Sequence, residues 1–257
     1  MAELDFLAAS LLPPGVSELA AAGLVGLALV TSALTAAAGI GGGLVLLGVM
    51  ASFLPPAVVL PVHGVVQLGS NAGRAALMRR HIDGRIVMPF ALGSVLGIMI
   101  GAKLFVALPT PVLQAVLGAF VLAAVWLPGL RASRIAHWAF AVVGLVGSFC
   151  TMFVGATGPF VASFIRPERL ERHAVVATHA TCMTLQHTLK VVAFGFLGFA
   201  FLPWVPLLAV MIGAGFVGTV LGRRLLDRLP HRAFQQAFKI ILTVLALRLL
   251  YEALVAW

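Results

Sequence analysis

The chain has 257 residues, of which 61% are apolar and only 10% charged, and its mean hydropathy is +1.11. These values lie outside the range of soluble domains and predict an all-α polytopic membrane protein without a soluble domain. The net charge of +9 would suggest nucleic-acid binding in a soluble protein, but here the bases lie in short loops between apolar segments. That is the positive-inside pattern, so we expect a lipid bilayer as partner and no nucleic acid.

The first apolar segment begins near residue 19. Glu3, Asp5 and Glu18 precede it, with no Lys or Arg. Because a cleaved signal peptide has a basic region before its apolar core, we expect this segment to stay in the protein as its first membrane segment.

The glycine-rich stretch AGIGGG, residues 38–43, interrupts this first segment. Non-helical backbone at membrane depth is tolerated only where it is buried in protein or lines a cavity. Glycine lets an anion approach the backbone closely, and the N-terminus of a following helix offers free N–H groups. The alternative is that these glycines serve close helix packing. We expect substrate-binding residues here, namely Gly39, Ile40, Gly41 and Gly42.

The next helix carries a polar stripe. His63, Gln67 and Asn71 are spaced four residues apart and share one helix face, and Arg74 follows three residues later. Polar groups inside a membrane are costly unless they face a cavity or a partner. We therefore expect the first three to bind substrate and Arg74 to be a gate or an anion-attracting charge. The alternatives are a helix-to-helix hydrogen bond for His63 and an interfacial anchor for Arg74.

The basic loop RRHIDGR, residues 79–85, separates this helix from two further apolar spans, at 86–106 and 112–130. Glycines at four-residue spacing predict close helix packing in the first of these spans and in a later one, at 205–222. They are Gly93, Gly97 and Gly101, and Gly218 and Gly222. Single bases near span ends, Lys103 and Arg248, are expected to be interfacial anchors.

The second half of the chain contains a similar break, VGATGP at residues 154–159. It adds Gly155, Ala156, Thr157 and Gly158 to the expected substrate-binding residues, and Pro159 suits a first helical position. The helix that follows has its own polar residues close to one stripe. Of these we expect His179, Gln186 and His187 to bind substrate and Lys190 to be a gate or anion-attracting charge, with the same alternatives as in the first half.

The two halves align when the chain is shifted against itself. A shift of 121 residues superimposes residues 97–114 on 218–235, whereas the earlier part of each half needs a shift of 116. The difference implies five extra residues around 194–206. We infer a duplication, with residues 1–130 and 131–257 as the two transmembrane repeats. The shift of 116 aligns Ser32, Thr35, Gly39, Gly42, Val45, His63, Asn71 and Arg74 with Ser148, Thr151, Gly155, Gly158, Val161, His179, His187 and Lys190.

Two topologies fit this duplication. If each broken segment crosses once, eight spans result, the halves have the same orientation, and the basic loops at 79–85 and 223–232 lie on opposite sides, against the positive-inside rule. If each broken segment is a re-entrant hairpin, six spans and two hairpins result, and all basic loops are cytoplasmic. We prefer this second topology, which makes two inverted pseudo-symmetric repeats, each a glycine-broken helical hairpin plus three transmembrane helices. Full crossing of the segments before the breaks stays open.

The chain resembles the sulfite exporter TauE/SafE family, also called the TSUP family. The resemblance rests on the duplication, the GIGGG break, the H-x-x-x-Q-x-x-x-N pattern from His63 to Asn71, the G-x-x-x-G helix and the second break GATGP. It extends over nearly the whole chain. It implies a transporter of sulfite, sulfonates or related sulfur-containing anions and organic acids.

No catalytic constellation is evident in the apolar spans. They contain no Asp or Glu, and His179 and His187 are eight residues apart, which does not suit paired metal ligands on a helix. We therefore expect no enzyme activity, no catalytic residues, no metal and no cofactor. The two cysteines, Cys150 and Cys182, are too few for a disulfide framework, and we interpret them as small buried hydrophobes.

The leading hypothesis is a secondary transporter of a small anion in the cell inner membrane, with a midplane site formed by the two glycine-rich breaks and the polar helices. The substrate class, sulfite or an organosulfonate, comes from the family resemblance. The alternatives are an anion-conducting channel or a transporter of other small organic anions. The N-terminus is predicted to be periplasmic. Transport direction, the coupling ion (H⁺ or Na⁺) and a homodimer are left open, although histidine is the plausible carrier if protons are involved.

Overall fold

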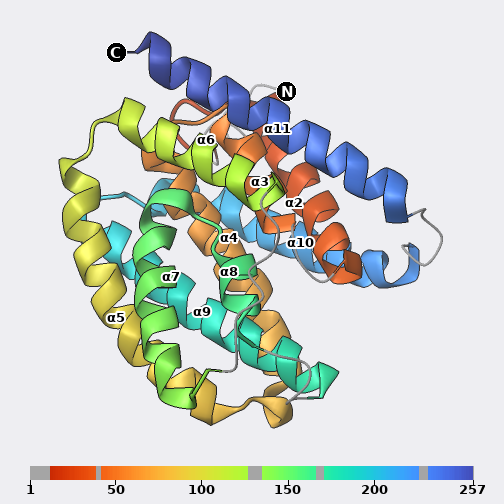
Figure 1. Cartoon of the computed structure of the whole chain (residues 1–257). Coiled ribbons are helices and arrows are strands. Elements are labelled where there is room, and N and C mark those ends of the chain that lie inside the picture. The colour runs from red at the N-terminus through yellow and green to blue at the C-terminus, as the bar shows by residue number, and fades with distance from the viewer. Residues whose placement is uncertain (1–11, 39–41, 127–134, 166–170, 226–230, 257) are drawn as a thin grey trace.

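The computed structural model describes residues 12–38, 42–126, 135–165, 171–225 and 231–256. All regular elements in these residues are helical, which confirms the predicted all-α class for the described part of the chain (Figure 1). The first half contains α2 (Glu18–Ala38), α3 (Gly42–Ala51), α4 (Pro56–Leu77), η1 (Arg79–His81), α5 (Gly84–Ala107) and α6 (Thr110–Trp126). The second contains η2 (His137–Ala139), α7 (Phe140–Val154), α8 (Gly158–Ala162), α9 (Arg172–Phe196), η3 (Leu202–Trp204), α10 (Val205–Leu225) and α11 (His231–Val255).

Four helical segments among the described residues are long and apolar enough to cross a membrane. They are Glu18–Thr35, Gly84–Val106, His137–Val154 and Leu202–Gly222. Helices α4 and α9 are also long, with 22 and 25 residues, but polar stripes lower their mean hydropathy. The prediction of an integral membrane protein is therefore confirmed. The segments before both breaks, in α2 and in η2 with α7, are each long enough to cross the bilayer.

Both predicted helix interruptions are present. α2 ends at Ala38 and α3 begins at Gly42, while Gly39, Ile40 and Gly41 lie outside the described residues. α7 ends at Val154, and Gly155 follows in the left-handed region with a φ of 73°. Only glycine enters this region without a steric penalty, so the second break is encoded by the residue that ends the helix.

The elements of the second half repeat the register of the first. α8 and α9 begin 116 residues after α3 and α4, and α10 and α11 begin 121 residues after α5 and α6. The extra residues lie where the change of shift predicts them, because α9 extends further than α4 and a longer link, with Gly198 at a φ of 89°, leads into α10.

The glycines at four-residue spacing bring helix backbones together, as the sequence predicts. A Cβ on Gly93 or Gly97 would collide with the backbone of α7, at Ala141 and Leu145 respectively, and one on Gly101 would crowd Met152. The contacts advance in the same direction along both helices, so α5 and α7 are parallel and in close contact.

The same arrangement recurs between α10 and α2. A Cβ on Gly218 would collide with the backbone at Leu29, and one on Gly222 with the backbone at Ala33. These contacts also advance together, so α10 and α2 run parallel.

Helices α4 and α9 cross in the middle of the bundle and run antiparallel (Figure 1). Gly64, near the start of α4, lies against Lys190, near the end of α9. At the other end, the His81 and His173 rings are 5.6 Å apart between centroids, and the backbone N–H of Asp83 donates to Thr178 Oγ1 at 3.0 Å. The basic loop after α4 therefore lies beside the N-terminal end of α9.

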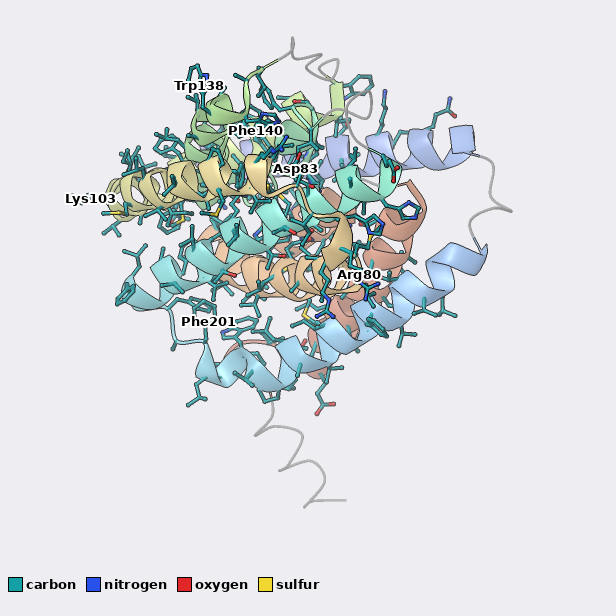
Figure 2. The ribbon with its side chains drawn as sticks, turned by 90° about the horizontal axis from the view of Figure 1, so that it is seen from below. Arg80, Asp83, Lys103, Trp138, Phe140 and Phe201 are labelled. Carbon is teal, nitrogen blue, oxygen red and sulfur yellow. The ribbon has the colours of Figure 1, made fainter. Side chains whose placement is uncertain are left out.

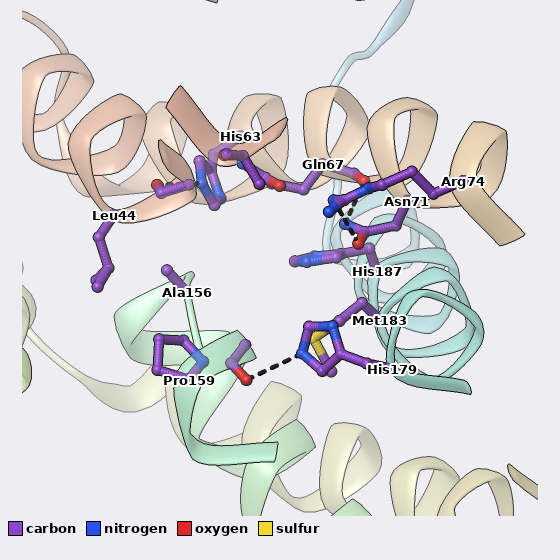
Figure 3. Close-up of a pocket in the computed structure, with 13 residues that line it drawn as sticks. Leu44, His63, Gln67, Asn71, Arg74, Ala156, Pro159, His179, Met183 and His187 are labelled. Carbon is purple, nitrogen blue, oxygen red and sulfur yellow. Dashed lines mark hydrogen bonds between the residues drawn. The ribbon is translucent and has the colours of Figure 1, made fainter. Parts of the chain in front are cut away.

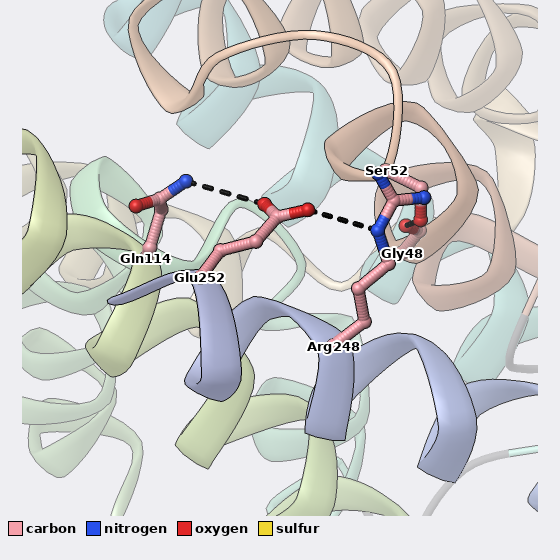
Figure 4. Close-up of polar contacts among 5 residues, drawn as sticks. All are labelled: Gly48, Ser52, Gln114, Arg248 and Glu252. Atoms are coloured by element: carbon pink, nitrogen blue, oxygen red, sulfur yellow. Dashed lines mark hydrogen bonds and ion pairs between the residues drawn. The ribbon is translucent and has the colours of Figure 1, made fainter. Parts of the chain in front are cut away.

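Helices α6 and α11 also run antiparallel. Trp126, at the end of α6, donates to Thr243 Oγ1 at 2.9 Å, whereas Gln114, near its start, donates to Glu252 Oε2 at 3.4 Å. Arg248 makes an ion pair with the same carboxylate at 2.8 Å (Figure 4). Arg248, predicted to be an interfacial anchor, is exposed and pairs with a residue one turn further along α11.

Two other sequence predictions concern side chains outside the polar stripes. Lys103 is exposed near the C-terminal end of α5, as expected for an interfacial anchor (Figure 2). Cys182 is fully buried in an apolar cluster and Cys150 is partly buried, and neither forms a disulfide.

Candidate functional site

A cavity lies where the two breaks meet the polar stripes of α4 and α9 (Figure 3). Its volume is about 60 Å³. Since one buried water needs roughly 10–15 Å³ on this scale, the cavity accommodates about four to six non-hydrogen atoms. The lining residues are Thr35, Gly43, Leu44, His63, Gln67, Asn71, Arg74, Ala156, Gly158, Pro159, His179, Met183 and His187.

The stripe of α4 enters the cavity as one connected set of side chains. Arg74 donates from Nη2 to Asn71 Oδ1 at 2.9 Å and from Nε to the backbone carbonyl of Ser70 at 3.3 Å. Asn71 in turn donates to the carbonyl of Gln67 at 2.8 Å. A guanidinium has five N–H donors, so this arrangement fixes the position of Arg74 and leaves donors free for a ligand.

The two aligned histidines each bind the first turn of the helix after a break. His63 Nε2 lies 2.9 Å from the carbonyl oxygen of Gly43, and His179 Nε2 lies 3.0 Å from that of Gly158. A carbonyl only accepts, so Nε2 of each ring carries the hydrogen and donates. Both rings line the cavity, and their Nε2–H groups hold the broken segments against α4 and α9.

Several predicted site residues support the breaks and do not line the cavity. Gln186 donates to Thr157 Oγ1 at 2.7 Å, and Ser148 donates to Gln186 Oε1 at 3.5 Å; all three are buried. Gly42 packs so closely on α2 that a Cβ would collide with the Thr31 carbonyl. Gly155 ends α7 and is likewise absent from the lining.

Lys190 is also absent from the lining, although it lies close by. Its side chain is fully buried, and a Cβ on Gly64 would lie 3.2 Å from its Cε. The Nζ atom has no hydrogen-bond partner among the described residues. Arg74 therefore lines the cavity, whereas its equivalent in the second half, Lys190, does not.

Five lining residues are missing from the sequence prediction of the site. One of them could have been found from the repeat, because the shift of 116 places Met183 opposite Gln67. The same shift places Pro159 opposite Gly43, but neither is a predicted site residue. Thr35 lies one helical turn before the first break. No polar signal marks Leu44, which lies in the first turn of α3. The missed residues are Thr35, Gly43, Leu44, Pro159 and Met183.

The lining is suited to an anion. It offers the guanidinium of Arg74, two amides, a hydroxyl and three imidazoles, and none of its described members is an Asp or Glu. Charged and polar groups at membrane depth are retained where they face a cavity and bind a partner. A cavity with donors and one permanent cation favours a small anionic ligand.

The sequence model of one protein family, Sulfite exporter TauE/SafE, matches residues 24–249 of the chain. The match includes both breaks and every lining residue of the cavity. No curated protein and no solved structure matches the chain.

Proposed function

Because the chain belongs to the sulfite exporter TauE/SafE family, whose members are membrane transporters of sulfur-containing anions, we propose that it is a secondary transporter of sulfite or a small organosulfonate. The anion would bind in the cavity between α3, α4, α8 and α9. This cavity would open to one side of the cell inner membrane and then to the other. The observation that carries the proposal is the donor-rich lining with Arg74 and without a carboxylate. Sulfite is a compact oxyanion of the size that this cavity accommodates.

The packing directions support an inverted duplication of residues 1–130 and 131–257. If both halves had the same orientation, α4 would run parallel to α9, and α6 parallel to α11. Both pairs are antiparallel. The hairpin topology also requires α5 to run parallel to α7 and α2 parallel to α10, as they do. In this topology the N-terminus is periplasmic and the basic loops are cytoplasmic.

Within the site, we assign direct contact with the anion to the residues that line the cavity. Arg74 supplies the charge, and Gln67 and Asn71 supply amide donors. His187 contributes an imidazole from α9. His63 and His179 bind the breaks through Nε2 and present their rings to the substrate.

The remaining predicted residues shape the breaks around the anion. Thr157 and Gln186 fix the turn after α7 through their mutual hydrogen bond. Backbone N–H groups of the breaks complete the proposed site. Gly42 and Gly155, like Thr157, are described break residues outside the lining, and we propose the same supporting role for Gly39, Ile40 and Gly41, which lie outside the described residues.

Transport by purified full-length protein in liposomes tests this function. We expect saturable sulfite flux that is accelerated by sulfite on the opposite side, since counterflow requires a site with alternating access. Methanesulfonate tests the sulfonate class, and acetate and chloride serve as comparison anions. Absence of sulfite and sulfonate flux from correctly inserted protein would refute the proposal. Voltage-driven currents far above carrier rates, without counterflow, would identify an anion channel instead.

A further inference from the structure

Three buried nitrogen atoms at or next to the cavity have no hydrogen-bond partner among the described residues. They are Nδ1 of His63, Nδ1 of His187 and Nζ of Lys190. The exposed fractions of these residues are 0%, 4% and 0%. Buried polar atoms are nearly always paired, so three orphaned nitrogens in one place indicate a missing ligand.

The three residues converge from the two crossing helices. The centroids of the His63 and His187 rings lie 6.2 Å apart in an edge-to-face arrangement. Lys190 passes over Gly64, the neighbour of His63, with Cε 3.2 Å from where a Cβ of that glycine would lie. A side chain at position 64 would crowd this lysine, so the glycine makes room for it.

No described carboxylate is in a position to neutralise Lys190. Of the described acidic residues, Glu18 lies in the first turn of α2, and Glu252 pairs with Arg248 on α11. The other two, Asp83 and Glu171, lie at the N-terminal end of α9, where Asp83 binds Thr178, more than ten residues before Lys190. Burial of an unpaired ammonium is costly, and so is burial of any polar group without a partner. An oxyanion would supply both the charge and the acceptors.

The hydrogen-bonding state of His63 specifies the ligand further. Its Nε2–H is used by the carbonyl of Gly43, so Nδ1 of the neutral ring bears a lone pair. Such an atom accepts a hydrogen bond and therefore requires a donor on the ligand. The Lys190 ammonium offers donors to the ligand's other oxygens.

We propose that Lys190 and the two lining histidines, His63 and His187, form a second, inner anion position next to the cavity, and that it selects a small oxyanion that still carries one proton, such as hydrogensulfite. The position is closed here, because Lys190 lies outside the cavity lining and all three nitrogens are inaccessible. The anion reaches it when the cavity extends toward Lys190. This inference rests on the proposed anion transport and adds to it a second binding position and a criterion for substrate choice.

Variants of full-length protein in liposomes test the inner position, with sodium sulfite and sodium methanesulfonate as probes. Lys190→Met removes the ammonium at similar side-chain size and should lower sulfite flux about ten- to hundredfold. Lys190→Arg, which keeps the charge, should retain more flux than Lys190→Met. Lys103→Met, at an exposed lysine of α5, is the matched control and should stay within about twofold of wild type.

His63→Gln tests the selection of a protonated oxyanion. Glutamine keeps an N–H donor for Gly43 but loses the acceptor at Nδ1. Sulfite flux should fall about tenfold while methanesulfonate flux, which needs no such acceptor, changes by less than about twofold. The ratio of sulfite flux to methanesulfonate flux is measured in the same variant, so it does not depend on how much of the protein is expressed or inserted.

Wild-type sulfite flux in the Lys190→Met variant would overturn the inner position and make Lys190 a neutral buried amine. Equal losses for both anions in His63→Gln would overturn the selection of a protonated ligand. Neither outcome would contradict the proposed function, which is refuted only if the wild-type protein transports neither anion.

Discussion

Arg74 and Lys190 are basic residues at equivalent positions, 116 residues apart, but their surroundings in the two halves differ. Arg74 lines the cavity and is held by Asn71, whereas Lys190 is enclosed and has no partner among the described residues. The alignment of the two halves predicts that these positions are equivalent. It does not predict their different burial, because burial depends on how the rest of the bundle covers each helix.

Arg74→Met should weaken sulfite binding about ten- to hundredfold, because it removes the charged donor from the cavity lining. Isothermal titration of the purified protein measures this effect. Arg248→Met is a suitable control, since Arg248 lies on α11 and pairs with Glu252 away from the cavity. Equal affinity in the Arg74 variant and in wild type would remove Arg74 from the anion site.

Gly155→Ala should destabilise the protein by about 1–3 kcal/mol, because Gly155 is in the left-handed region and a Cβ would lie 2.7 Å from Leu47 Cδ1. Thermal unfolding in detergent checks this. Gly158→Ala is the matched control in the same break, since its Cβ would find no atom closer than 3.8 Å. Similar unfolding midpoints for both variants would contradict the role of Gly155 as the residue that ends α7.

At the scale of the helices, the sequence predicts much of what is observed. The glycine spacing identifies the faces of α5 and α10 that touch their neighbours, and the two glycine-rich stretches identify where helices stop. The polar stripe of α4 follows from four-residue spacing alone. The stripe of α9 is harder to predict, because Gln186 and His187 are adjacent and point about 100° apart on a helix. Only His187 reaches the cavity; Gln186 binds Thr157.

Gly218→Ala should disrupt the contact between α10 and α2, because the added Cβ would meet the carbonyl of Leu29, and backbone cannot move aside as a side chain can. We expect a loss of about 1–3 kcal/mol, measured as a lower unfolding midpoint in detergent. Gly213→Ala, in the same helix, has nothing within 4 Å of its Cβ and should be neutral or slightly stabilising. The opposite ranking would refute close packing at Gly218.

For the whole molecule, the charges of the loops and the packing of the helices both support the proposed arrangement of two inverted halves. The sequence could suggest inverted halves only through the positive-inside rule. The antiparallel packing of α4 on α9 and of α6 on α11 is an independent argument from side-chain contacts. The cavity itself could not be predicted from the sequence, since its walls come from five helices whose crossing angles depend on the complete bundle.

A cysteine-accessibility experiment tests this orientation. Arg80→Cys and Arg228→Cys, each in a chain lacking Cys150 and Cys182, place single thiols in the two most basic loops. We expect an impermeant thiol reagent to label both from the cytoplasmic side. Labelling of the two positions from opposite sides of the membrane would refute the inverted arrangement.

The parallel contacts of α5 with α7 and of α2 with α10 have a consequence for movement. Each joins a helix of one half to a helix of the other, with glycines that let the backbones touch. These contacts resist sliding of one helix along the other, because no side chain separates the two backbones at the glycine positions. In the proposed transport cycle we therefore expect α5 to move with α7 and α2 to move with α10, as rigid pairs. Each moving body would then contain helices from both halves, and neither proposed repeat would move as a unit.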